Sequence, residues 1–283
     1  MLTTTKLSAL LGMALAIGTG AAITVSHLNA QQPLLLQPTT ISVNNPRPLA
    51  RALASVQEIY RSVIDFEEVP YEHPADLDST LFPGSSGASP HVVPHGGQLT
   101  VTLSPGADTT PYLAAESVLS AFISAGYGGE YVVQQGQGRI EVVPTRLRGA
   151  NGSMRNVLPI MGIQISLPLA NRPAAATFAL LATKLSAASG IRVVLADEPF
   201  QDNAMIEYGA ENKSARDIIA EIASRSGMPL SFMLLYDPYE KSHYLTIKNV
   251  APTSPPVGAT TSIPRVATPK TSPADSPFFV KSN

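Results

Sequence analysis

The chain has no cysteine and no tryptophan among its 283 residues, and only 14% of its residues are charged. Without cysteine it can form no disulfide, no thiolate zinc site and no catalytic cysteine. Lys and Arg sum to 19 against 21 for Asp and Glu, which gives a net charge of −2. This balance excludes a polybasic nucleic-acid binder, whose affinity comes from many phosphate contacts. Hydrophobic residues make up 44% of the chain, so a packed core can still form.

The N-terminus has the layout of a secretory signal peptide. Lys6 precedes an apolar run over residues 7–17, small residues follow, and Leu28-Asn29-Ala30 is an acceptable cleavage site. We therefore expect residues 1–30 to be a signal peptide. If it is not cleaved, the apolar stretch 7–25 is close to the length of about 20 residues that crosses a bilayer, and it would act as an anchor. In both cases we expect the remainder to be periplasmic or secreted, or anchored in the inner membrane and facing the periplasm.

Residues 41–144 predict a first small module in the order strand, helix, strand, loop, strand, helix, strand, strand. Pro48 suits the first turn of a helix, and Leu49, Leu53 and Val56 then fall on one helical face. The segment 69–97 is rich in proline and glycine and predicts a long loop, which is uncommon inside a compact domain unless it is functional or disordered.

Residues 163–250 predict a second module with the same order of elements but a much shorter loop. Ser214 is expected to cap one of its helices, and Gly190 and Gly227 are expected to end two helices. Residues 145–162 are polar and predict a linker between the modules. The fold class is therefore α/β in the α+β sense, with two tandem modules. Common descent of the two halves and convergence on one amphipathic pattern both remain open.

Residues 251–283 are rich in proline, serine and threonine and predict a disordered tail. Phe278 and Phe279 interrupt this composition. They are either a stray apolar pair or a short docking motif.

The second module carries a family resemblance. Ile165-Ser-Leu-Pro-Leu-Ala leads into a helix, Ser189-Gly190-Ile191 follows it, and Ser214-Ala215-Arg216-Asp217-Ile218-Ile219 and Ser226-Gly227-Met228-Pro229-Leu230 mark the second helix. This pattern resembles the short N-terminal (STN) domain of secretins and TonB-dependent receptors, most clearly at residues 163–250 and more loosely at 41–144. The resemblance implies a small α/β module of the bacterial envelope that recognises other proteins and has no catalytic residues. It does not imply transport or channel formation.

Three histidines in the first module suggest an alternative chemistry. His73, His91 and His95 lie in the long loop near several carboxylates, and imidazole and carboxylate groups are zinc ligands. However, Pro94 separates His91 from His95, so the two do not share one helical face. A metal-dependent hydrolase that uses loop 73–95 is therefore the alternative function. Glu67 and Glu68 are interpreted as part of a solvated run of charges.

Aromatic residues near the C-terminal hairpin are the predicted recognition residues. Tyr236, Tyr239 and Tyr244 surround a turn and suit a binding surface, although ordinary cross-strand packing is the interpretation that the pattern favours. The last strand is expected at or near a sheet edge, which can accept a partner strand. Together with Phe278 and Phe279, these tyrosines are the predicted partner-binding residues.

The sequence thus predicts an exported, non-enzymatic protein that binds another envelope protein or itself. We expect no catalytic residues, no metal site, no cofactor, no nucleic-acid partner, and membrane contact only through an uncleaved N-terminal helix. A structural spacer anchored by residues 7–25 is a further alternative.

Overall fold

The computed structural model describes residues 37–80, 91–104, 110–196 and 204–250, which form a mixed α/β fold. This confirms the predicted α/β class in the α+β sense. The helices in these ranges are α1 (Pro48–Tyr60), α2 (Pro111–Ser124), α3 (Ala174–Ser189) and α4 (Ala215–Ser226), with the 3₁₀ turns η1 (Pro74–Asp76) and η2 (Ile160–Gly162).

The strands form one large sheet and three two-stranded ribbons. The sheet has the spatial order β10 (Val193–Leu195), β13 (Ser242–Asn249), β12 (Leu230–Asp237), β2 (Ile64–Glu67), β7 (Arg139–Arg148) and β6 (Glu130–Gly136), and β8 (Met154–Asn156) pairs with β7. The ribbons are β1 (Thr39–Asn45) with β5 (Gly97–Leu103), β9 (Gln164–Pro173) with β11 (Met205–Ser214), and β3 (Leu77–Thr80) with β4 (His91–Pro94).

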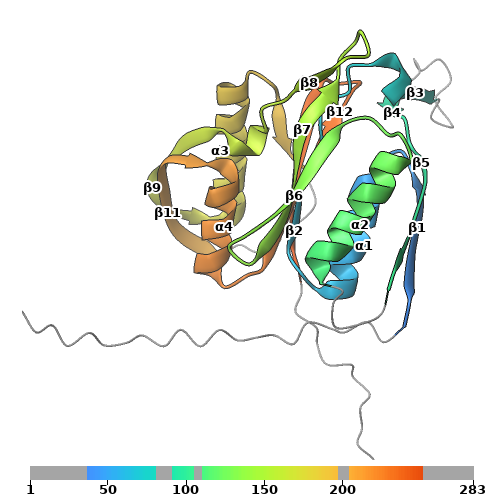
Figure 1. Cartoon of the computed structure of the whole chain (residues 1–283). Helices are drawn as coiled ribbons and strands as arrows, with labels where there is room; N and C mark the ends of the chain where they lie inside the picture. Colours follow the sequence, from blue (N-terminus) through green and yellow to red (C-terminus); the bar gives the residue numbers. More distant parts are fainter. Residues whose placement is uncertain (1–36, 81–90, 105–109, 197–203, 251–283) are drawn as a thin grey trace, which may run out of the picture. The chain divides into compact units, whose positions relative to one another are not determined.

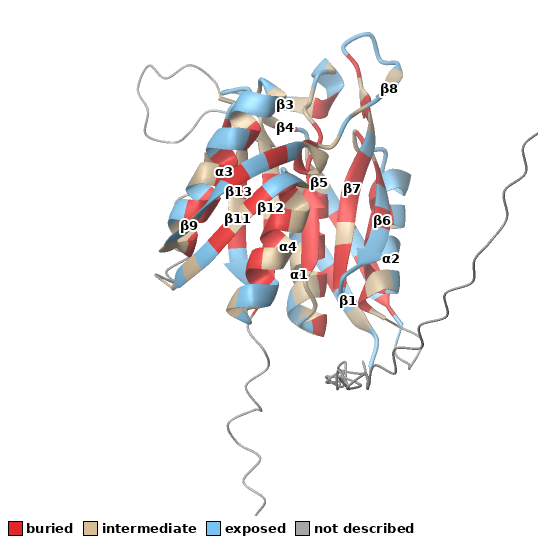
Figure 2. Cartoon of the chain, turned by 90° about the vertical axis from the view of Figure 1, so that its left-hand side faces the viewer, coloured by how far each residue is buried: buried red, intermediate tan, exposed pale blue. Residues whose placement is uncertain are grey.

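The two helix pairs lie on opposite faces of the large sheet (Figure 1). Helices α1 and α2 pack between one face and the β1–β5 ribbon, and α3 and α4 pack between the other face and the β9–β11 ribbon. Strand β12 contributes to both cores, because Phe232 and Leu234 belong to the α3/α4 core while Met233 packs against the α1/α2 core. The buried residues accordingly gather in the sheet and on the inner faces of the helices (Figure 2).

Strand pairing repeats between the two halves of the chain. Strand β2 is parallel to β7, and β10 is parallel to β13. Strand β6 is antiparallel to β7, and β12 is antiparallel to β13. The ribbons β1–β5 and β9–β11 are both antiparallel and also correspond. Each half therefore contributes three strands in the same relative order to the large sheet.

Helix boundaries follow the local signals in the sequence. The Thr110 hydroxyl accepts a hydrogen bond from Leu113 N at 3.2 Å, and the Ser214 hydroxyl accepts one from Asp217 N at 3.2 Å, so each satisfies an amide of the first turn. Gly190 and Gly227 end their helices in the left-handed conformation, with φ of 71° and 67°.

Two segments contain more regular structure than we expected. The described part of the 69–97 loop includes η1, which begins at Pro74, and the paired strands β3 and β4, in which Val92 and Val93 lie opposite Ser79 and Asp78. The expected linker 145–162 contains the end of β7, strand β8 and η2. Residues 154–156 pair back onto residues 146–148 of β7, and Val157 N donates to the Thr145 carbonyl.

Several predictions concern residues outside the described ranges. These are the signal peptide or anchor at 1–30, the tail 251–283 and its Phe278 and Phe279. Within the described ranges, no helix is long and apolar enough to span a membrane.

Candidate functional site

The two halves meet where β12 pairs in parallel with β2. Met233 lies opposite Phe66 and Leu234 lies opposite Glu67, and Glu68 N donates to the Leu234 carbonyl at 2.8 Å. Strand β2 carries Asp65 and Glu67, Glu68 follows it directly, and all three are buried. The interpretation of Glu67 and Glu68 as solvated charges is therefore wrong. They are buried because the second half covers the side of β2 that a single half would leave in water.

Asp65 ties both halves together through one carboxylate. It accepts hydrogen bonds from Arg139 Nε at 2.7 Å and Arg139 Nη2 at 2.8 Å, and from Phe232 N of β12 at 2.8 Å. Arg139 also donates to the Leu230 carbonyl at 2.9 Å. Burial raises the pKa of Asp65 to about 6, while Arg139 and the Phe232 amide favour its charged form.

Glu67 binds the start of the second half. Its carboxylate accepts hydrogen bonds from Ile160 N and Met161 N of η2, and Arg216 of α4 lies 3.4 Å away. Arg216 also binds Glu141 of β7 at 2.5 Å. Burial raises the pKa of Glu67 to about 7, while Arg216 and the two amides lower it.

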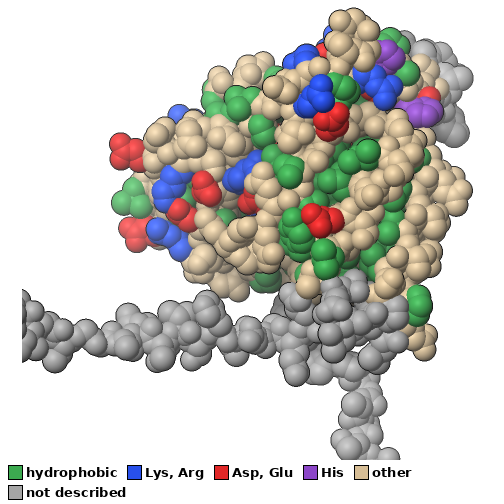
Figure 3. All heavy atoms as spheres, in the orientation of Figure 1, with side chains coloured by type: hydrophobic (Ala, Val, Ile, Leu, Met, Phe, Trp, Pro, Cys, Tyr) green, Lys and Arg blue, Asp and Glu red, His purple; other side chains and the backbone are tan. Residues whose placement is uncertain are grey.

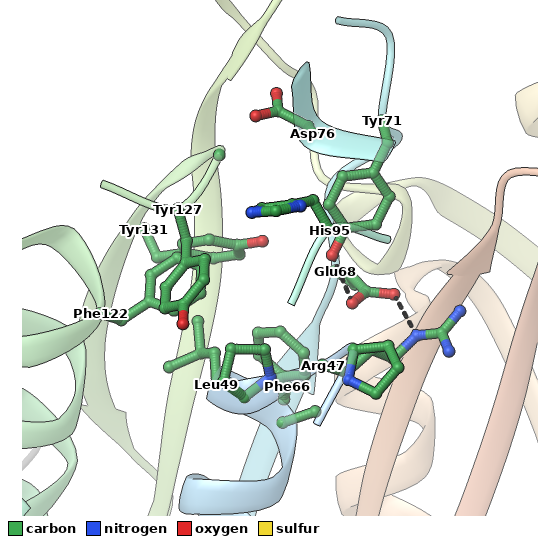
Figure 4. A pocket seen from close by; sticks show the side chains of 14 residues that line it. Arg47, Leu49, Phe66, Glu68, Tyr71, Asp76, His95, Phe122, Tyr127 and Tyr131 are labelled. Carbon is green, nitrogen blue, oxygen red and sulfur yellow. Dashed lines mark hydrogen bonds and ion pairs between the residues drawn. The ribbon is translucent and has the colours of Figure 1, made fainter. Parts of the chain in front are cut away.

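Glu68 lies between Arg47 and Tyr71 (Figure 4). It accepts from Arg47 Nε at 3.1 Å, from Tyr71 Oη at 2.7 Å and from Tyr236 N of β12 at 2.8 Å. Arg47 reaches further and donates to the Tyr236 carbonyl at 2.7 Å. Glu68 and Arg47 together thus hold the backbone of β12 at Tyr236.

These contacts make the acidic cluster a joint. Each of the three carboxylates receives three donors from within the chain, and both oxygens of each are engaged. The cavity beside Glu68, bordered by His95, Tyr127 and Tyr131 in Figure 4, has a volume of about 10 Å³. That is room for one water molecule.

The three candidate zinc-binding histidines do not converge. His73 Nδ1 accepts a hydrogen bond from Ala75 N, the His91 ring lies 4.5 Å from the Tyr239 ring, and His95 Nδ1 pairs with Asp78 at 3.0 Å. Among the residues that the structure describes, no group of three His, Asp or Glu side chains is placed to hold a metal ion.

The three predicted tyrosines share a hairpin but not a surface. Tyr236 lies opposite His243 and Tyr244 lies opposite Leu235, so the alternation of side chains sends Tyr236 and Tyr244 to opposite faces of the sheet. Tyr236 packs against the rings of Tyr71 and His243, at centroid distances of 6.4 and 5.0 Å. Tyr239 is the exposed member, at 49%. Strand β13 is not the edge of the sheet, since β10 lies outside it.

His243 is buried and has no hydrogen-bond partner on either ring nitrogen. Burial lowers the pKa of its imidazole from 6.5 to about 4. The ring is therefore neutral at pH 7, and it acts as an apolar packing residue between the strands.

A different surface is open to a partner. In the part of the chain that the structure describes, β6 is an end strand of the large sheet and pairs with β7 alone, and a groove of about 420 Å³ runs between it and α2. Ile123 is 51% exposed and Val132 is 37% exposed. The rest of the lining is mixed and includes Leu119, Tyr112, Glu116, Ser120 and Ser124. Hydrophobic side chains gather on this face of the molecule (Figure 3).

The backbone of β6 presents hydrogen-bonding groups to this groove. The Val133 carbonyl accepts a long hydrogen bond of 3.4 Å from the Tyr112 hydroxyl on α2, so it points away from β7. Since the N–H and C=O of a strand residue point to the same side, Val133 and, two residues on, Gln135 direct their amides outward. Exposed edge groups of this kind pair with an added strand.

The sequence alone predicts only part of this surface. Strand β6 and the helix 111–124 are predicted by their apolar patterns, but nothing in the pattern distinguishes an end strand from an inner one. Ile123 reads as a core residue of α2, because it continues the apolar face formed by Val118, Leu119 and Phe122.

No family model, no curated protein and no solved structure matches the chain.

Proposed function

We propose that this protein is an exported, non-catalytic interaction module of the bacterial envelope, built from two tandem halves of the STN type. The export rests on the N-terminal signal pattern, and the family rests on the sequence resemblance. The repeated strand pairing of the two halves supports the tandem arrangement.

The binding surface of the proposed function is the α2/β6 groove together with the outward backbone of β6. The observation that carries this proposal is the joint itself. Strand β12, which corresponds to β6, already binds a strand in parallel along its equivalent edge. The Leu234 carbonyl receives the Glu68 amide there, and Val133 holds the corresponding position on β6. The same type of sheet edge therefore binds a strand at β12 and is open at β6.

Strand addition also explains how such a surface recognises a partner. Main-chain hydrogen bonds to β6 would supply affinity, and side chains of the partner that enter the groove beside Ile123 would supply specificity. The acidic residues have a structural role in this proposal, since both oxygens of each carboxylate bind donors within the chain.

Site-specific photo-crosslinking tests the proposal in intact cells. A photoreactive amino acid replaces Ile123 in the groove, and a control chain carries it at Leu169 of β9, which is 71% exposed. We expect a covalent adduct with a protein at position 123 and none at 169. Equal labelling at both positions, or no adduct at either, would contradict a binding function of this groove.

A further inference from the structure

The two halves are joined head to tail, and this joint leaves a matching pair of edges unused. In the half formed by β2, β7 and β6, the outer strands are β2 and β6. In the half formed by β10, β13 and β12, they are β10 and β12. The joint uses β12 and β2, so β6 and β10 remain at the two ends of the sheet. The free strand β6 corresponds to β12 of the joint, and the free strand β10 corresponds to β2.

The registers make this correspondence specific. Phe66 lies opposite Val142 in β7, and Leu195 lies opposite Leu245 in β13. Val142 and Leu245 are therefore equivalent positions. Val133 lies opposite Val142 and Leu234 lies opposite Leu245, so Val133 corresponds to Leu234, and Val132 corresponds to Met233. The contact between Met233 and Phe66 at the joint therefore corresponds to a contact between Val132 of one copy and Leu195 of another.

The backbones of the two free strands point the right way for this pairing. In β10, the Arg192 carbonyl accepts from His243 N and Ala196 N donates to the Leu245 carbonyl, so residues 192, 194 and 196 face β13. Leu195 then directs its N–H and C=O outward, as Phe66 does at the joint. On β6, Val133 and Gln135 direct theirs outward.

The side chains at the two free ends differ in charge from those at the joint. At the joint, acidic Asp65 and Glu67 of β2 face the side of α4, where Arg216 binds Glu67. At the corresponding positions β10 carries Val194, and Ala196 follows it. These small apolar residues would face α2, whose exposed Ile123 and buried Leu119 line the open groove. An acidic strand thus meets an arginine in the joint. At the free end an uncharged strand would meet a groove of mixed character, in which Ile123 and Leu119 lie beside Glu116.

We propose that the partner of the α2/β6 groove is a second copy of this chain, which adds its β10 in parallel to β6 and continues the large sheet from one molecule to the next. This inference rests on the proposed function, because it names the occupant of the same groove. The contact is heterologous, so copies assemble head to tail into an open chain or, if the rotation closes, into a ring.

Complementary single-edge variants test the head-to-tail arrangement. The exported chain, purified as the cell produces it, is compared by sedimentation velocity over a concentration series with Ile123→Lys and Val194→Lys. The lysine blocks the β6 groove in the first variant and the β10 edge in the second. We expect the unmodified chain to form dimers and larger species as concentration rises, and each variant to stay monomeric. A 1:1 mixture of the two variants should reach twice the monomer mass and no more, because one intact contact remains.

The mixture also guards against a trivial result, since only folded variants can restore a dimer. Leu169→Lys, with the same charge on an exposed leucine of β9, should assemble like the unmodified chain. Two outcomes overturn the inference: a monomeric unmodified chain over the whole series, or assembly that Ile123→Lys abolishes and Val194→Lys leaves intact. If the chain is monomeric while position 123 still crosslinks to a different protein, the proposed function stands and the self-association does not.

Discussion

Replacing Arg139 with methionine probes the joint between the two halves most sharply. Arg139 is buried, and its guanidinium donates two hydrogen bonds to Asp65 and one to the Leu230 carbonyl. Arg139→Met keeps much of the aliphatic volume and removes all three donors. Asp65 then retains only the Phe232 amide, in a site without access to solvent.

The cost follows from leaving a buried charge without its partner. Removing one member of a buried ion pair typically destabilises a protein by about 3–5 kcal/mol. With a urea dependence of about 3 kcal/mol/M, the upper range for small proteins, the unfolding midpoint should fall by roughly 1–1.7 M. The matched control is Arg192→Met, which breaks the exposed pair with Glu240 at 3.0 Å. That pair should contribute less than about 1 kcal/mol.

The double variant Asp65→Asn/Arg139→Met separates the charge from the packing. Asparagine still offers an oxygen to the Phe232 amide but carries no charge. We expect the double variant to recover more than half of the stability that Arg139→Met loses in urea unfolding. A loss below about 1 kcal/mol for Arg139→Met, or no recovery in the double variant, would refute the reasoning that the buried Asp65–Arg139 pair stabilises the joint.

Two further predictions concern the fold. His243 stays neutral in the folded chain down to about pH 4, because burial lowers its pKa, but it titrates near 6.5 when the chain is unfolded. Acidification from pH 7 to 4 should therefore lower the unfolding free energy of the unmodified chain by about 3 kcal/mol relative to that of His243→Leu. Urea unfolding of both chains at each pH measures this difference. Asp65 and Glu67 are present in both chains, so their own titration cancels in this comparison, and parallel pH profiles would contradict the assignment. Gly96→Ala should lower stability by about 1–3 kcal/mol or more, because its Cβ would lie 2.1 Å from the Asn45 carbonyl oxygen, whereas Gly136→Ala meets no atom within 4 Å and should change the melting temperature little. Equal melting temperatures for the two alanine variants would show that the backbone relaxes at Gly96.

The sequence predicted local structure well where the signal is local. Pro48, Thr110, Ser214, Gly190 and Gly227 mark helix boundaries in the structure, because a cap or a left-handed end depends on a few adjacent residues. The mixed α/β class followed from the order of these elements.

The joint could not be predicted in the same way. Asp65 and Glu67 alternate with Ile64 and Phe66 in β2, which reads as a strand with one face in water. Their burial depends on β12, about 165 residues later in the chain, and on Arg216 of α4. No short-range pattern carries a contact between elements so far apart.

The recognition residues illustrate the same limit. Tyr236 was a reasonable candidate because tyrosine is common in interfaces, yet its backbone binds Arg47 and Glu68 within the chain. Whether Tyr239 and Tyr244 bind a partner stays a prediction. The α2/β6 groove emerges only when the order of strands shows which strand is left at the end of the sheet.

Residue-resolved amide hydrogen exchange tests the central claim most directly, namely that one type of sheet edge is filled at the joint and open at β6. The Glu68 amide, bonded to the Leu234 carbonyl, should be protected at every protein concentration. The outward Gln135 amide should exchange rapidly in dilute solution and become protected as the concentration rises. Rapid exchange at Glu68, or exchange at Gln135 that does not depend on concentration, would contradict the account.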